Sequence, residues 1–109
     1  MKNFSDRFSL SIHCAVAQKL RINGDEILGV ARSNLERWMR SGSFDRAEIA
    51  SLREWKEILD RNNTEEIYKL ITSDTDEGQR LRSSSPFVGI LSTEERSKSW
   101  SECAEIGLA

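Results

Sequence analysis

The residue types that bind metals or attack substrates are scarce in this sequence. The only histidine, His13, is followed directly by Cys14, and the one other cysteine is Cys103. Structural zinc sites take four ligands that usually arrive as close pairs along the chain, so these three residues predict no metal site. Successive residues of a helix point about 100° apart, so His13 and Cys14 do not form a base and its nucleophile. We expect both cysteines to be small residues of the core.

Acidic residues form clusters, but their spacing fits helix starts better than sites. The run Asp74–Gly78 resembles the beginning of an EF-hand loop, which needs glycine at its sixth position and glutamate at its twelfth. Here glycine is the fifth residue and Ser85 is the twelfth. Carboxylate pairs such as Glu65-Glu66 stand where a helix is expected to begin, and the helix dipole favours them there. The sequence therefore predicts no catalytic residue, no metal ligand and no cofactor, and we expect a protein that is not an enzyme.

The segment Arg80–Leu91, RLRSSSPFVGIL, is the first candidate binding site. Guanidinium groups pair with carboxylates, and aromatic side chains anchor protein interfaces. Arg80, Arg82 and Phe87 are therefore predicted to contact a protein partner. Because Pro86 ends the preceding helix, we expect Phe87 in a pocket between helices and at least one of the two arginines on the surface. That outward arginine is expected to contact the partner through bidentate pairing with an acidic group. In the alternative interpretation the apolar residues fill the bundle and the arginines pair with nearby acidic side chains.

A second candidate site lies in the stretch Leu28–Trp38, LGVARSNLERW, which is followed by Gly42-Ser43-Phe44. These residues resemble the recognition-helix half of small excisionase-like and MerR-like DNA-binding domains. The resemblance implies that Arg32, Arg37 and Arg40 contact phosphates or bases. Those families have a turn before the recognition helix, whereas residues 25–28 here continue the same helix. The alternative is that the three arginines occupy the solvent face of an amphipathic helix.

Apolar residues recur at helical spacing along most of the chain. The first helix carries Phe8, Ile12, Val16 and Leu20 and is expected to begin at a Ser5 or Asp6 cap. A break at 23–25 precedes a second helix that ends at Gly42. A third helix is expected to begin at Asp45, which forms a capping box with Glu48, and to end at residues 62–63. A short fourth helix is expected over residues 65–71, with Thr64 as its cap. The last two are expected from 73–77 to 81 or 82, and from 93 to about 105 behind the Ser92–Glu95 capping box.

This pattern predicts an all-α, single-domain bundle of five or six helices over residues 1–109, with an extended apolar loop near residues 83–91. The chain has 109 residues, 38% of them hydrophobic, and this length suits one domain with its own core. We expect one contiguous cluster in that core, formed by Leu35, Trp38, Leu52, Trp55, Leu59 and Leu70.

Composition narrows the location and the partners. No apolar run is long enough to span a membrane, no secretory signal is recognisable, and two cysteines are too few for a disulfide scaffold. We therefore expect a cytoplasmic protein that does not enter a membrane. The net charge of −2 excludes nucleic-acid binding by bulk charge alone.

Three stretches together resemble a pattern shared by small bacterial proteins of undefined activity, some of which are similar to antitoxins of toxin–antitoxin pairs. They are NLERW at 34–38, LxxWxxIL at 52–59 and LRSSSPF at 81–87, and the likeness covers about residues 13–98. The resemblance implies a small cytoplasmic helical protein that works through a protein partner. We predict a non-enzymatic interaction protein, antitoxin-like or a regulatory subunit. The alternative is a DNA-binding regulator that uses the Arg32–Arg40 helix.

Overall fold

The helical spacing of the sequence is realised as six helices. The structure, a computed structural model, describes the backbone of residues 4–108 and the side chains of residues 5–101. No strand occurs among these residues, which confirms the all-α class. The helices are α1 (Phe4–Ile22), α2 (Gly24–Ser41), α3 (Arg46–Arg61), α4 (Thr64–Ile71), α5 (Asp76–Arg82) and α6 (Thr93–Leu108).

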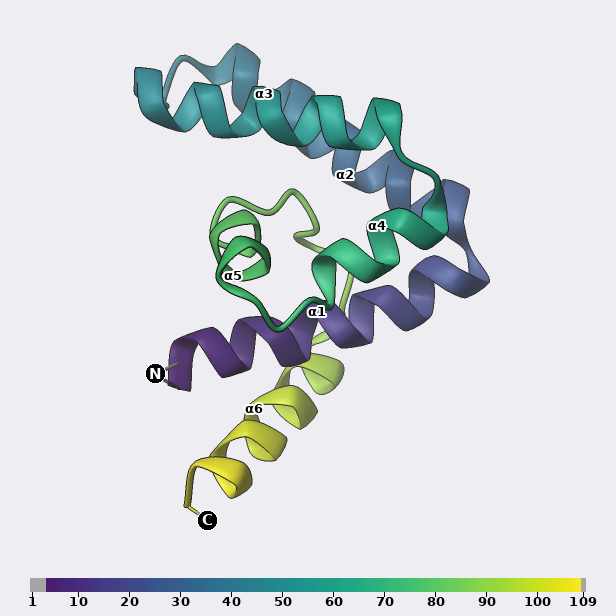
Figure 1. Ribbon diagram of the computed structural model, residues 1–109, viewed down its shortest axis with the longest axis vertical. Coiled ribbons are helices and arrows are strands. Elements are labelled where there is room, and N and C mark those ends of the chain that lie inside the picture. The colour runs from purple at the N-terminus through teal and green to yellow at the C-terminus, as the bar shows by residue number, and fades with distance from the viewer. Residues whose placement is uncertain (1–3, 109) are drawn as a thin grey trace.

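The long helix α1 is the centre of the arrangement (Figure 1). It packs against α2, α4, α5 and α6, while α2 and α3 form an antiparallel hairpin at one end of the molecule. The short helix α5 lies between that hairpin and α1, and α6 covers the other side of α1. No described helix is long and apolar enough to cross a membrane.

The helix boundaries follow from capping residues that the sequence supplies. Gly42 ends α2 in the left-handed conformation, with φ of 72°, which glycine adopts without strain. Asp45 and Glu48 form the expected capping box of α3, with bonds of 2.8 and 3.0 Å. The expectation that Thr64 caps α4 was wrong by one residue, because the Asn63 side chain accepts from the Glu66 amide.

The expected start of the first helix was also wrong. Its first turn already includes Ser5 and Asp6, the two residues expected to precede it as caps, because α1 begins at Phe4. The start of α6 is as expected, since Ser92 and Glu95 bond reciprocally at 2.8 and 3.1 Å.

Trp55 occupies the middle of the hydrophobic core. Its side chain is 0% exposed, its indole N–H donates to the Leu81 carbonyl at 2.9 Å, and its ring meets the edge of Phe87 with centroids 5.8 Å apart. The cluster predicted around it is confirmed: Leu35, Leu52 and Leu59 are buried in one core, and Trp38 and Leu70 pack against that core.

Residues 83–91 form a loop, as expected, and buried polar side chains attach it to the helices. The loop is not extended throughout, because Ser83 and Ser84 form a turn and the Val88 amide donates to the Pro86 carbonyl. The Asn34 amide of α2 donates to the carbonyls of Pro86 and Val88, at 2.9 and 3.0 Å. From α1, His13 Nε2 lies 2.8 Å from the Ser85 hydroxyl. The Asn34 bonds satisfy backbone carbonyls that have no helical partner, and the His13–Ser85 bond fixes a side chain of the loop, so the loop has one defined path over the core.

Candidate functional site

Arg80 and Arg82 are two residues apart on α5 and have opposite environments. Arg80 is exposed, and its guanidinium donates to both carboxylate oxygens of Glu54 at 2.9 Å and also to Glu77. These bonds, first the one to Glu54, raise the pKa of Arg80. Arg82 is only 4% exposed. The expectation that one arginine faces outward is therefore met by Arg80, although its guanidinium is already engaged within the chain.

Among the described residues, the guanidinium of Arg82 donates hydrogen bonds from one of its three nitrogen atoms. Its Nη1 donates to the Ser73 carbonyl at 2.6 Å, with a longer contact to the Ile71 carbonyl. Its Nε and Nη2 are buried and have no acceptor among the described residues. Burial lowers the pKa of Arg82, and the negative charge of the Asp6 carboxylate opposes that shift. Because arginine stays protonated in proteins, Arg82 is a buried cation with unused hydrogen-bond donors.

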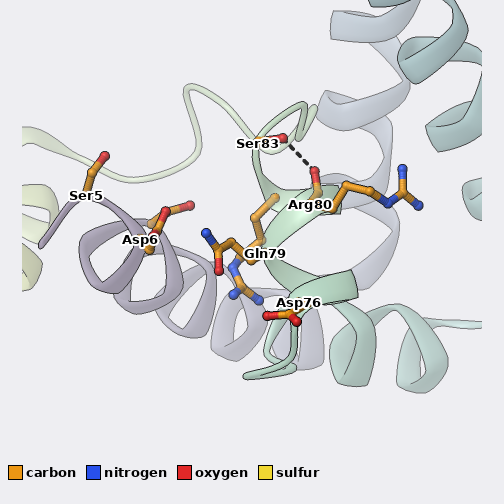
Figure 2. Close-up of a pocket in the computed structure, with 8 residues that line it drawn as sticks. Ser5, Asp6, Asp76, Gln79, Arg80 and Ser83 are labelled. Carbon is orange, nitrogen blue, oxygen red and sulfur yellow. Dashed lines mark hydrogen bonds between the residues drawn. The ribbon is translucent and has the colours of Figure 1, made fainter. Parts of the chain in front are cut away.

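Arg82 lines a cavity of about 700 Å³ between the beginning of α1 and one side of α5. Figure 2 shows Asp6 of α1 facing Gln79 and Asp76 of α5 across this space, while the Arg80 side chain extends away from it. Ser5 and Ser9 complete the α1 wall. Two carboxylates border the cavity, which Arg80 and Arg82 also line, and they repel a singly charged carboxylate less than a phosphate, which carries more negative charge.

Phe87 belongs to the core. It is 4% exposed and packs on Trp55, so it lies between helices as expected. Arg82 is equally buried but lines a cavity, whereas Phe87 lines neither that cavity nor the one beside Trp38 and Phe44. The residue next to it, Val88, is half exposed. The prediction that Phe87 contacts a partner is therefore corrected: the apolar residues after Pro86 need cover, and the bundle itself supplies that cover.

His13 and Ser85 form a pair with the spacing of a base and a nucleophile. His13 Nδ1 lies 2.7 Å from the Ser9 carbonyl, which only accepts, so Nδ1 carries the hydrogen and Nε2 accepts from the Ser85 hydroxyl. The Ser85 oxygen also accepts the Phe87 amide hydrogen at 3.1 Å. The next residue, Pro86, has no amide hydrogen to donate to an oxyanion. This pair therefore suits attachment of the loop better than catalysis.

The three arginines of the DNA-binding interpretation differ in their contacts. Arg32 donates to Asp60 at 2.6 Å and to the Leu59 carbonyl, and Arg37 donates to the buried Asn34 at 2.7 Å. Arg40 is exposed at the end of α2. The helix α2 runs without interruption from Gly24 to Ser41, so the turn that precedes a recognition helix in those families is missing here.

The expectation that both cysteines lie in the core was wrong for Cys14, which is exposed on α1. The Cys103 side chain lies outside the described residues. Within the described part of the chain, no three histidine, cysteine or acidic side chains gather as metal ligands would.

Sequence patterns missed the α1 wall of the cavity and the buried polar attachments of the loop. Ser5, Asp6 and Ser9 read as the first turn of a helix, and Asn34 as one more polar residue of α2. Nothing in their spacing indicates the contacts that they make with residues more than 50 positions away. The RxR sequence at residues 80–82 was one usable signal for this site. Residues two apart on a helix face different sides, so the two arginines were expected to have different environments.

Comparisons of the chain with protein-family models, with curated proteins and with solved structures find no match.

Proposed function

We propose that this protein is a non-enzymatic interaction protein that binds a protein partner at α5, where Arg82 receives a carboxylate of the partner. The observation that carries this proposal is the environment of Arg82. A guanidinium that is 4% exposed, with two unused donors, lines a cavity wide enough for a side chain. Groups of this kind are costly to leave unpaired in a protein interior, so their presence favours a ligand that pairs with them.

The geometry of Arg82 suits a carboxylate in particular. The bond from Nη1 to the Ser73 carbonyl fixes the guanidinium plane before any ligand arrives. The Nε and Nη2 hydrogens point in parallel along one edge of that plane, which is the arrangement that a carboxylate accepts with both oxygens. Because Nε and Nη2 are buried, the residues that cover them would have to move aside before a partner's carboxylate could form this bidentate charge-assisted pair.

In an antitoxin-like or regulatory role, such binding would cover a surface of the partner. Affinity in protein interfaces comes from a few well-buried contacts, and charge complementarity contributes specificity. The Arg82 cavity offers one such contact, surrounded by the polar side chains of Ser5, Ser9 and Gln79.

The test is affinity capture from a lysate of the source cells, comparing wild type with Arg82→Lys and Arg80→Ala, each first checked for fold by circular dichroism. Arg82→Lys keeps the charge but loses the bidentate edge, so we expect the partner to be lost. Loss of one hydrogen bond between charged groups weakens binding by about 1.5–3 kcal/mol, or about tenfold and more. Arg80→Ala is the matched control and keeps the partner, because the Arg80 guanidinium is directed to Glu54 and Glu77.

A second variant keeps the test decisive if Arg82→Lys fails to fold. Ser5 is exposed at the rim of the cavity, so Ser5→Trp obstructs the cavity without entering the core, and it should also abolish capture. Folded Arg82→Lys and Ser5→Trp proteins that retain the partner would refute the proposal. Binding of duplex DNA that weakens steeply with salt would instead favour the Arg32–Arg40 helix as the functional surface.

A further inference from the structure

A second cavity, of about 280 Å³, opens between the end of α2, the beginning of α3 and residues 83–85. Its walls are the side chains of Trp38, Phe44 and Leu52 together with serines and Glu48. Glu48 is the one charged residue among the described residues that line it. Ser83 lines this cavity and the Arg82 cavity alike, so the two open on neighbouring parts of one surface.

The two aromatic rings leave surface for a ligand. Trp38 and Phe44 have centroids 6.2 Å apart and planes inclined at 52°, and both side chains are half-buried. The face of an aromatic ring carries negative charge, and it attracts cations placed within about 6 Å. A guanidinium gains more than an ammonium here, because it is planar and stacks on aromatic faces.

Glu48 supplies a negative charge at a fixed place beside these rings. Its Oε1 accepts the Asp45 amide hydrogen at 3.0 Å, and its own amide donates to the Asp45 carboxylate at 2.8 Å. This capping box orders a side chain that is otherwise exposed. Two aromatic faces and one ordered carboxylate are together complementary to a cation. An apolar side chain in this cavity would leave the carboxylate unpaired.

We infer that the Trp38–Phe44 cavity binds an arginine side chain of the protein partner. The inference rests on the proposed function in one respect only, since it takes the occupant to be part of a protein. Because Ser83 borders both cavities, the partner segment would present this arginine close to the carboxylate that pairs with Arg82. The Arg82 cavity takes a negative group of the partner, and the Trp38–Phe44 cavity takes a positive one. A partner segment that presents these two charges in the reverse order is therefore disfavoured.

The experiment titrates the isolated protein with N-acetyl-arginine amide and follows the indole N–H signal of Trp38 by NMR. N-acetyl-citrulline amide is the matched probe, because it has nearly the shape of arginine without its charge. We expect arginine to shift the Trp38 signal saturably, and citrulline to bind about two- to fivefold more weakly, as a cation–π contact at an exposed site implies.

Glu48→Gln tests the carboxylate. Glutamine also completes a capping box, so the helix start is kept while the charge is lost. Arginine binding should weaken about two- to fivefold, as for an exposed ion pair. The control Glu57→Gln removes the same charge from the exposed face of α3 and should leave binding unchanged. Phe44→Leu removes one ring and should weaken binding by a similar factor.

Equal binding of citrulline, no response at Trp38, or equal effects of Glu48→Gln and Glu57→Gln would each overturn the inference. Arg82→Lys should leave this titration unchanged, because Arg82 does not line the Trp38–Phe44 cavity. A failure of the arginine site is therefore distinguishable from a failure of the proposed function, which the capture experiment measures.

Discussion

Asn34→Asp should destabilise the protein out of proportion to the size of the change, which replaces an amide NH₂ by an oxygen. The Asn34 amide is buried and donates to the Pro86 carbonyl at 2.9 Å and to the Val88 carbonyl at 3.0 Å. An aspartate has the same shape but no donor when ionised, so a negative oxygen would face two carbonyl oxygens at these distances. The bond from Arg37 to the Asn34 oxygen remains possible.

The magnitude follows from the groups left unpaired. Two neutral hydrogen bonds contribute about 0.5–1.5 kcal/mol each, and a buried acceptor without a donor costs about 1–3 kcal/mol. The Pro86 carbonyl keeps its bond from the Val88 amide, so the Val88 carbonyl, which is partly buried, is the acceptor left unpaired and its cost lies at the low end of that range. We expect the free energy of unfolding to fall by about 2–4 kcal/mol at pH 7, against a typical total of about 5–15 kcal/mol.

Urea unfolding followed by circular dichroism measures this difference. The matched control is Asn63→Asp, the same substitution at the exposed cap of α4, where the side chain accepts from the Glu66 amide and aspartate caps equally well. This control should be neutral or slightly stabilising. If Asn34→Asp unfolds at the same urea concentration as Asn63→Asp, the buried amide does not hold the loop and our account of residues 83–91 is wrong.

Three further predictions follow from burial and close contact. Trp55→Ala should lower the free energy of unfolding by about 3–5 kcal/mol in urea, as for other buried aromatic residues. Gly78→Ala should destabilise, because a Cβ there would overlap the Ser73 carbonyl oxygen, whereas Gly29→Ala meets nothing nearby and should stabilise a helix interior by about 0.5–1 kcal/mol. Burial lowers the pKa of His13 below 6.5, so the unfolded chain takes up the proton first as pH falls. The free energy of unfolding should therefore decrease between about pH 7 and 5 by at most about 1.4 kcal/mol per pH unit, and His13→Gln should abolish that slope.

Local signals account for the parts of the fold that were predictable. The Asp45–Glu48 capping box and Gly42 set helix ends through residues at most four positions apart, and apolar spacing identified Trp55 as core. Each of these features depends on the geometry of one helix or one turn. Sequence alone reveals them because no distant part of the chain takes part.

The candidate site depends on contacts between distant segments, and these were not predictable. The two arginines of α5 were recognised as facing different ways, but which one is buried depends on α1 and on the Ser73 carbonyl. Phe87 was recognised as apolar and helix-excluded, yet only the packing of the loop on Trp55 decides that it is covered. The position of Asp6 opposite Gln79 likewise requires the path of the whole chain between them.

The energetics of Arg82 separate a role in folding from a role in binding. A buried ion pair replaced by apolar residues of similar volume is often neutral or stabilising, whereas breaking a fully used pair costs about 3–5 kcal/mol. Among the described residues, Arg82 bonds through Nη1 to the Ser73 and Ile71 carbonyls, and its Nε and Nη2 have no acceptor. Arg82→Met should therefore change the free energy of unfolding in urea by less than about 1.5 kcal/mol, since it removes a buried charge with unused donors along with one good hydrogen bond. The same variant should lose the captured partner. A loss of stability of about 3 kcal/mol or more would show instead that Arg82 is kept for its bond to Ser73, and the argument that its unused donors await a carboxylate would fail.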